Sequence, residues 1–303
     1  MNERARGTVE MTTAMTISGT IGWFVVVCGQ PIADVVFWRC LFGAATLLAI
    51  CAARGLLRRE ILTLRQGVLA AAGGVAIVLN WLLLFAAYSR ASISIATAVY
   101  NTQPFMLVGL GVLAFAERLT AAKLTWLGVA FAGTLAIAQA KPGAGVAGAD
   151  YLAGILMSLR AAFFYALAAI VAKTLKGVPP HLIALIQVVV GIAMLAPFAG
   201  LSRLPASPQT WATLGALGVV HTGLMFTLLY GAIQKLPTYL AGSLSFIYPV
   251  VAILVDRIGF GRRLGALQIA GVAAILISAA GMTLDWSPLK RRAQKPAADL
   301  AAR

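Results

Sequence analysis

A nine-residue segment in the first half of the chain recurs, loosely, in the second half. Residues 96–104 read Ala-Thr-Ala-Val-Tyr-Asn-Thr-Gln-Pro and residues 241–249 read Ala-Gly-Ser-Leu-Ser-Phe-Ile-Tyr-Pro, so alanine matches alanine and proline matches proline at one offset of 145 residues. Both copies lie in long apolar stretches, where proline interrupts helical hydrogen bonding. A duplicated, proline-broken membrane helix indicates the binding site of a transporter.

The composition places the chain in a lipid bilayer. Of its 303 residues, 61% are hydrophobic and 11% are charged, whereas a soluble domain has about half apolar and about a quarter charged residues. A crossing helix needs about 20 apolar residues, and lipid satisfies no backbone hydrogen bonds, so long continuous apolar runs predict helices rather than open sheets. We therefore expect an all-α polytopic membrane protein.

Apolar runs between charged or Gly- and Pro-rich breaks predict ten transmembrane helices. The Gly- and Ala-rich link 141–150 divides them into two sets of five. We expect a first five-helix repeat over residues 10–140, a second over residues 150–285 and a basic cytoplasmic tail over residues 286–303. The ten expected spans are residues 11–29, 34–53, 67–88, 92–115, 123–140, 151–175, 181–201, 209–233, 239–258 and 264–284.

Lysine and arginine orient the predicted bundle. Sixteen of the 24 basic residues fall on the side of the two termini, six fall on the opposite side, and Arg39 and Arg160 fall inside spans. Basic residues accumulate in cytoplasmic segments, so both termini are expected in the cytoplasm. Clustering at span ends also argues against nucleic-acid binding as the reason for the net charge of +15. Because each set has five spans, the second set must insert upside down, which predicts an inverted repeat.

Further motifs accompany the duplicated helices. They are Glu117-Arg118-Leu119 after the fourth span, Gly128-x4-Gly133 in the fifth, Pro31-x7-Arg39 at the second, and Trp23 of the first span in the place matching Tyr165 of the sixth. Over residues 10–285 the chain resembles the EamA-type, ten-helix branch of the drug/metabolite transporter superfamily. Within that branch it looks most like the bacterial YddG-type exporters of aromatic and other neutral amino acids. The second half departs from the family pattern, with Gly259-Phe260-Gly261-Arg262 where Gly-Glu is frequent and Gln187 where the first half has Arg39.

Polar side chains inside the spans are the candidates for substrate contact, because polar groups are expensive at membrane depth. Thr97, Tyr100, Asn101 and Pro104 fall at i, i+3, i+4 and i+7, which is one face of a helix. Pro104 and Pro249 each remove a backbone donor and free the carbonyls of Tyr100 and Ser245, which can accept from a substrate ammonium group. The candidate substrate-binding residues are Trp23, Asn80, Trp81, Tyr100, Asn101, Tyr165, His221, Ser245 and Tyr248, with Pro104 and Pro249 as helix kinks.

Each candidate also has a purely structural interpretation. A membrane proline can be a tolerated kink, serine and threonine can bond to their own helix, and a neutral His221 can bridge two helices. The aromatic candidates can face lipid, and Arg39 and Arg160 can extend to the membrane surface. Glu117-Arg118 is interpreted as a structural ion pair at the cytoplasmic rim rather than as a coupling site. At the level of the sequence these alternatives stay open.

None of the nine acidic residues falls at the middle of a span. A carrier of cationic drugs, or a proton relay built on carboxylates, needs such a group, so the sequence favours neutral or zwitterionic cargo. His221 is then the obvious protonation switch, because imidazole titrates near neutral pH. No residue cluster has metal-ligand spacing, so neither a metal nor a cofactor is expected, and a membrane enzyme such as an isoprenoid-phosphate processor is disfavoured.

These observations together predict a secondary transporter, not an enzyme, that exports small neutral metabolites, with amino acids, aromatic ones included, as the favoured class. Two inverted halves would alternate access to a central cavity, and the resemblance implies a bacterial inner membrane. The expected partners are a small-molecule substrate and the lipid bilayer, without nucleic acid, and the protein is a possible monomer. The alternatives are a nucleotide-sugar carrier of the same superfamily, which would need deep Lys or Arg, and a non-transport membrane scaffold.

Overall fold

The computed structural model describes residues 2–91, 93–138, 149–200, 204–260 and 265–286, and over these ranges all regular secondary structure is helical, without a strand. The predicted all-helical class is confirmed. Almost all of the expected link 141–150 and of the expected tail 286–303 lies outside the described residues. In chain order the elements are α1 Glu3–Gly19, α2 Ile21–Cys28, α3 Ile32–Ala53, η1 Arg59–Ile61, α4 Leu64–Ala91, α5 Ile93–Tyr100, α6 Gln103–Phe115, α7 Ala121–Ala138, α8 Ala149–Thr174, α9 Pro180–Leu195, α10 Pro208–Gly218, η2 Val219–Leu224, α11 Met225–Lys235, α12 Thr238–Ser245, α13 Ile247–Phe260 and α14 Ala266–Thr283.

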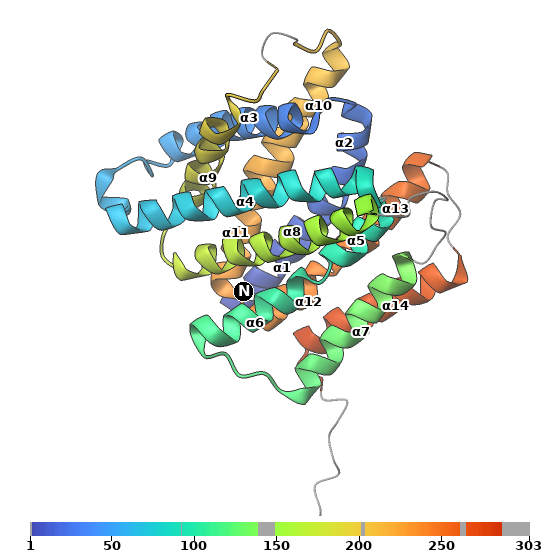
Figure 1. Ribbon diagram of the computed structural model, residues 1–303. Helices are drawn as coiled ribbons and strands as arrows, with labels where there is room; N and C mark the ends of the chain where they lie inside the picture. Colours follow the sequence, from blue (N-terminus) through green and yellow to red (C-terminus); the bar gives the residue numbers. More distant parts are fainter. Residues whose placement is uncertain (1, 92, 139–148, 201–203, 261–264, 287–303) are drawn as a thin grey trace, which may run out of the picture.

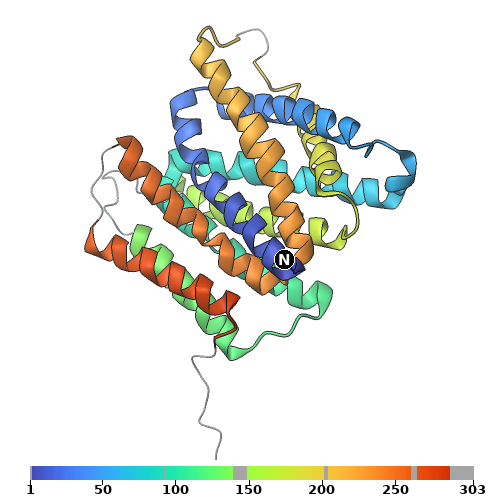
Figure 2. The ribbon, with the colours of Figure 1, turned by 180° about the vertical axis from the view of Figure 1, so that it is seen from behind.

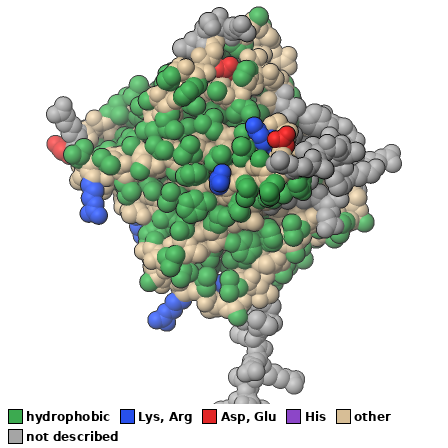
Figure 3. Space-filling view, viewed as in Figure 1, with side chains coloured by type: hydrophobic (Ala, Val, Ile, Leu, Met, Phe, Trp, Pro, Cys, Tyr) green, Lys and Arg blue, Asp and Glu red, His purple; other side chains and the backbone are tan. Residues whose placement is uncertain are grey.

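The helices have the length and the surface of a multi-pass membrane protein. In the described part of the chain, six helical stretches are long and apolar enough to cross a bilayer, and α6, the larger part of α7, and α9 are shorter apolar helices. Figure 3 shows one face of the molecule covered by hydrophobic side chains, with few charged ones scattered among them. An apolar exterior of this extent is stable only against lipid.

The helix starts follow local sequence signals. Asn2 caps α1, because its side chain accepts a hydrogen bond from the Ala5 backbone N–H at 2.8 Å, and α1 therefore begins at Glu3, earlier than the predicted residue 11. Pro180 and Pro208 stand at the first helical positions of α9 and α10, where the missing proline N–H has no intrahelical partner to lose.

Three of the expected spans are interrupted near their middles. The first divides into α1 and α2 at Thr20, the fourth into α5 and α6 after Tyr100, and the ninth into α12 and α13 after Ser245. The last two breaks are 145 residues apart and come just before Pro104 and Pro249, respectively. A fourth irregularity is η2, one stretch of wider π-helix between α10 and α11.

The helices pack in pairs that join the two halves of the chain. α7 lies along α14, and α4 lies along α8 (Figure 1). From the opposite side, α1 and α11 run next to each other (Figure 2). α3 also packs against α9, and α6 against α12. The main buried core fills the space between these pairs, so residues from both halves meet at the centre of the molecule.

Ion pairs tie the ends of helices from the two halves at the end of the molecule where α1 begins. Lys235 at the end of α11 pairs with Glu10 of α1 at 2.6 Å. Glu117, just after α6, pairs with Lys173 of α8 at 3.2 Å. The expected pairing of Glu117 with Arg118 is wrong: the Glu117 carboxylate contacts Lys173 of α8 and Thr238 of α12 instead.

Glycines allow α3 to approach α10 and η2 closely. A Cβ atom built on Gly218 would lie 2.2 Å from Cβ of Phe42 and 2.9 Å from the backbone nitrogen of Gly43. A Cβ on Gly43 would in turn lie 2.6 Å from Cγ2 of Thr222. Contacts this short do not occur between real atoms, so this packing requires glycine. On the same helix, a Cβ on Gly215 would meet nothing within 4 Å.

We expect Gly218→Ala to destabilise the protein by about 1–3 kcal/mol, because the added methyl group overpacks the contact between two backbones. Gly215→Ala is the matched control, and it should be neutral or stabilising, since alanine is the better helix former by about 1 kcal/mol. Chemical unfolding of both purified variants in detergent micelles measures the difference. Equal stability of the two variants would show that α3 and α10 can separate without cost.

Candidate functional site

Asn80 connects three helices at the centre of the molecule. Its side-chain nitrogen Nδ2 donates to the Tyr100 hydroxyl at 3.2 Å and to the Ala161 carbonyl at 2.8 Å. Asn80 belongs to α4, Tyr100 ends α5, and Ala161 lies in α8. Both side chains are buried, at 1% and 8% exposure. The sequence candidates Asn80 and Tyr100 are therefore brought together by a direct hydrogen bond.

Tyr165 of α8 continues this cluster toward the second proline-broken helix. Its ring meets that of Tyr100 edge-on, with centroids 6.2 Å apart. The Ser245 side chain interacts electrostatically with the Tyr165 hydroxyl, yet the buried hydroxyl has no hydrogen bond that meets normal geometry. A buried hydroxyl without a partner costs free energy, so Tyr165 is a group that an incoming polar ligand could satisfy.

Tyr248 extends the same group of side chains. It follows the break between α12 and α13 and interacts with the Tyr88 hydroxyl of α4, which also contacts Thr97 of α5. Tyr248 is half-buried. The polar centre formed by Asn80, Tyr88, Tyr100, Tyr165, Ser245 and Tyr248 thus contains residues of both proline-broken helices, and we call it the tyrosine cluster.

Two of the sequence candidates make hydrogen bonds within their own helices. The Asn101 side chain donates to the Thr97 carbonyl of its own helix turn at 2.8 Å, and the Ser245 hydroxyl donates to the Ala241 carbonyl at 2.9 Å. Both side chains are 1% exposed. Serine can bond to the backbone of its own helix, and Ser245 does so in this conformation. Asn101 also bonds to its own helix.

His221 lies in the π-helical stretch η2 and contacts the break in the first span. Its Nε2 atom is 2.7 Å from the Thr20 hydroxyl, and its Nδ1 atom is 3.4 Å from the Ala216 carbonyl. The Thr20 hydroxyl has one proton, and it can donate this proton either to the Ile17 carbonyl at 2.8 Å or to the Nε2 atom of His221. The ring therefore has two consistent hydrogen-bonding arrangements, and its protonation state is coupled to the irregular turn between α1 and α2. Wide helical turns of this kind are frequent at functional sites.

Trp81 and Arg39 form a second group next to His221. Trp81 of α4 is 6% exposed, and its ring meets Phe226 of α11 edge-on at 5.4 Å. The guanidinium carbon of Arg39 in α3 lies 4.1 Å from the centroid of the Trp81 ring. Extension to the surface, the structural interpretation given for both span arginines, does not describe Arg39, which is 1% exposed, whereas Arg160 is exposed on the surface of α8.

Trp23 is the sequence candidate that lies apart from these groups. It is 36% exposed and contacts only the edge of Phe24 among the described aromatic rings, at 5.0 Å. The break at Thr20 redirects the chain into α2, so Trp23 points away from the buried centre. At the 145-residue offset Thr20, rather than Trp23, corresponds to Tyr165.

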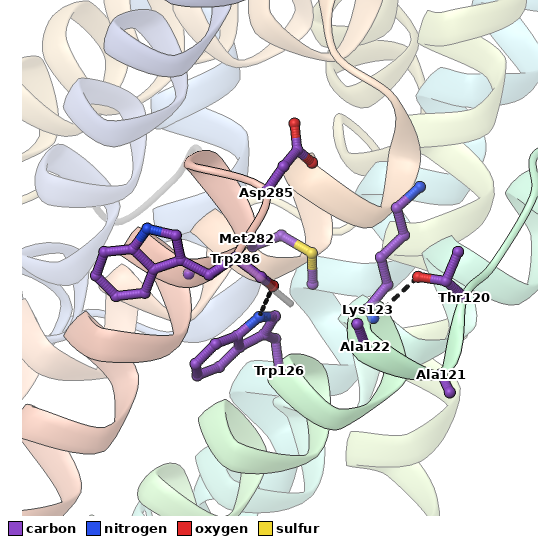
Figure 4. A pocket seen from close by; sticks show the side chains of 9 residues that line it. Thr120, Ala121, Ala122, Lys123, Trp126, Met282, Asp285 and Trp286 are labelled. Atoms are coloured by element: carbon purple, nitrogen blue, oxygen red, sulfur yellow. Dashed lines mark hydrogen bonds between the residues drawn. The ribbon is translucent and has the colours of Figure 1, made fainter. Parts of the chain in front are cut away.

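Two pockets of the structure lie away from the tyrosine cluster, in which Asn80, Tyr100 and Tyr165 are buried. One is a groove of about 430 Å³ between the start of α7 and the end of α14, lined by Lys123, Trp126, Asp285 and Trp286 among others (Figure 4). Trp126 donates its ring N–H to the Trp286 carbonyl at 2.9 Å there (Figure 4). Arg4 bonds to Asp285 at 2.8 Å, which holds the pKa of that carboxyl below its usual value. A second, apolar groove lies between α3 and α9.

Several polar groups at the centre are not among the substrate-binding candidates of the sequence analysis. Gln187 of α9 accepts a hydrogen bond from the Tyr230 hydroxyl of α11, and its side-chain nitrogen has no partner among the described residues. Thr20, Tyr88 and Tyr230 were overlooked as well. Each of these residues is a polar residue inside an apolar run, which is a signal that the sequence contains. The run does not show, however, which face of the helix is turned toward the protein interior. The described residues contain no group of three or more His, Cys, Asp or Glu side chains that could hold a metal ion.

Comparison with known proteins shows similarity to a family, to a curated relative and to solved structures. The model of the EamA-like transporter family matches twice, over residues 7–139 and 152–284. The "Uncharacterized transporter YxxF" of Bacillus subtilis (strain 168) is 28% identical over 289 residues, which cover 93% of this chain and 90% of that protein. One solved crystal structure of a protein, 21% identical, superimposes with a TM-score of 0.83 over 95% of this chain and 100% of that one. This last likeness establishes the shared fold.

Proposed function

The chain belongs to the EamA-like transporter family, and on that premise we propose that it is a secondary transporter that exports small neutral or zwitterionic metabolites. Amino acids, aromatic ones included, are the favoured class, as in the YddG-type exporters that the sequence resembles. Membership of the family points to a transporter of small metabolites rather than an enzyme. The further proposal concerns the cargo, the mechanism and the residues that bind.

The observation that carries the choice of cargo is the chemistry of the buried centre. Asn80, Tyr100 and Tyr165 provide amide and phenol groups next to aromatic faces, and among the described residues the ion pairs made by carboxylates lie at the end of the molecule where α1 begins. A centre with donors, acceptors and aromatic rings suits a zwitterion that carries an apolar side chain. It offers no carboxylate to a cationic drug.

The proposed mechanism is alternating access between two inverted five-helix halves. The packing supports this symmetry. At a separation of about 145 residues, α4 corresponds to α11 and α8 corresponds to α1, so the contact of α4 with α8 is equivalent to the contact of α11 with α1. By the same rule α3 corresponds to α9 and α7 to α14, and the members of each of these two pairs contact each other. Trp81 and Phe226, which are 145 residues apart, touch each other. Halves with equivalent packing can exchange conformations, which is the basis of this mechanism.

We propose that both termini are cytoplasmic, from the excess of basic residues on their side, in a bacterial inner membrane. The ion pairs Glu10–Lys235 and Glu117–Lys173 then lie at the cytoplasmic end. We propose that these ion pairs, when formed, hold the helix ends together at this end of the molecule. Substrate entry would require the pairs to separate. His221 is the proposed protonation switch, since its ring contacts the irregular turn at Thr20.

Transport is tested with the purified full-length protein in proteoliposomes. We expect labelled phenylalanine and tyrosine to enter faster than they enter empty liposomes, and faster than glutamate or a nucleotide sugar enters the same proteoliposomes. The same panel, run with and without an imposed pH gradient, shows whether proton movement drives uptake. Rates no higher than in empty liposomes for every amino acid, or preference for the nucleotide sugar, would contradict the proposal.

A further inference from the structure

Arg39 is a cation enclosed in the part of the protein that spans the membrane. It is the eighth residue of α3 and therefore lies about 10 Å along the helix axis from the start of α3. Its side chain is among the largest that are fully buried. Arginine remains charged in proteins, so this positive charge lies almost wholly inside the helix bundle.

The charge of Arg39 has only neutral partners. Its Nε atom donates to the Thr222 hydroxyl at 3.0 Å, its Nη2 atom donates to the His221 carbonyl at 3.2 Å, and its carbon lies over the Trp81 ring. Among the described residues no carboxylate lies within 4 Å of it. Asp34, the acidic residue at the start of the same helix, accepts instead from the Gly200 backbone N–H at 2.7 Å.

This arrangement leaves part of the guanidinium unused. A guanidinium has five N–H donors, and among the described residues only Nε and Nη2 donate hydrogen bonds, so Nη1 donates none. The two terminal nitrogens form the edge that binds a carboxylate with two parallel hydrogen bonds. A buried unpaired charge is costly, whereas the same charge becomes favourable when an anion with the right geometry joins it.

We infer that Arg39 binds the carboxylate group of the transported molecule. This inference rests on the proposed transport function and narrows its cargo to molecules that carry a carboxylate beside an apolar or aromatic group. Trp81 and Phe226, in edge-on contact at 5.4 Å, provide the neighbouring aromatic surface. The Thr222 and His221 bonds hold the guanidinium in place, so η2 positions Arg39 and the ligand completes its pairing.

Three ligands that share a phenyl ring separate the role of the ammonium group from the role of the carboxylate group in binding. Phenylalanine has both an ammonium and a carboxylate, phenylalanine amide lacks the carboxylate, and 3-phenylpropanoate lacks the ammonium. Binding of each probe to the purified full-length protein in detergent is measured by calorimetry, and uptake is measured in proteoliposomes. We expect the wild-type protein to bind the two carboxylates more tightly than the amide.

Arg39→Gln should weaken binding of phenylalanine and 3-phenylpropanoate about 10- to 100-fold, the range expected for loss of a charge-assisted pair, and leave binding of the amide nearly unchanged. Arg39→Lys keeps the charge but not the two-pronged geometry, so it should fold even where Arg39→Gln does not and should bind the carboxylates less tightly than the wild-type protein. Arg160→Gln is the matched control, because Arg160 is an exposed arginine in another span, and it should bind all three probes like the wild-type protein.

The outcomes separate the inference from the proposed function. If Arg39→Gln, or Arg39→Lys where Arg39→Gln does not fold, weakens all three probes equally or none of them, Arg39 is structural and the inference is wrong, whether or not amino acids are transported. If the wild-type protein binds 3-phenylpropanoate through Arg39 but neither binds nor transports phenylalanine, the inference stands and the proposed amino-acid cargo is wrong. Wild-type protein that binds the amide as tightly as the carboxylates also overturns the inference.

Discussion

Replacing Asn80 by alanine is expected to lower the free energy of unfolding by about 2–4 kcal/mol and to reduce amino-acid uptake about tenfold or more. The Asn80 amide donates hydrogen bonds to both the Tyr100 hydroxyl and the Ala161 carbonyl, so its removal takes away two hydrogen bonds between helices. It also leaves the Tyr100 hydroxyl buried without its donor, and each such group costs about 1–3 kcal/mol. Uptake falls because the phenol that faces the centre is no longer held in one orientation.

Asn101→Ala is the matched control for stability. Asn101 has the same side chain and the same 1% exposure as Asn80, but it bonds only to the Thr97 carbonyl. That carbonyl also accepts from the Asn101 backbone N–H at 3.0 Å, so it keeps a partner after the substitution. We expect a loss of about 1 kcal/mol or less.

Unfolding of both variants in mixed detergent micelles measures these differences, and the proteoliposome assay measures uptake. A larger loss of stability in Asn101→Ala than in Asn80→Ala would show that the bond network around Asn80 contributes little. Normal uptake in Asn80→Ala at unchanged stability would remove Asn80 from the proposed site. The two assays are needed together, because a destabilised protein also transports poorly.

The helical class and the membrane location could be predicted from the sequence because they depend on averages over whole segments. Apolar runs of about 20 residues and few charges leave lipid as the only suitable solvent. The places of the two proline-associated breaks could be predicted for a different reason, since proline acts locally on the residues before it. The break at Thr20 and the wider turn at η2 have no comparable local signal, because packing against neighbouring helices decides them.

The site could be predicted only in part because apolar periodicity is weak in a helix that faces lipid on one side and protein on the other. The candidates Asn80, Trp81, Tyr100 and Tyr165 are buried in the structure, and Asn80 stands out in the sequence because polar residues deep in a span are rare. Trp23 is also a candidate but lies on an exposed face. Arg39 was left between two interpretations because a long side chain near a span end can reach the surface, and only the contacts with Thr222 and Trp81 determine its direction.

Glu117→Ala is expected to destabilise the protein by about 2–4 kcal/mol. The Glu117 carboxylate accepts from both the backbone N–H and the hydroxyl of Thr238, at 2.9 and 2.7 Å, and pairs with Lys173. Thr238 begins α12, so the carboxylate also stabilises the positive end of that helix. Breaking a buried pair costs about 3–5 kcal/mol, and the range is lowered here because both side chains of the pair keep 14% exposure.

Two further variants determine where this stability comes from. Glu117→Gln keeps an acceptor for Thr238 and loses the charge, so its loss should be about half that of Glu117→Ala. Arg6→Gln removes an exposed partner of Glu10, while Glu10 keeps Lys235, and should cost about 0.5 kcal/mol or less. A double-mutant cycle of Glu117→Ala with Lys173→Ala should give a coupling energy of about 1–3 kcal/mol. A coupling near zero would mean that Glu117 acts through α12 alone, and the ion pair would then no longer count among the contacts that hold the two halves together at this end.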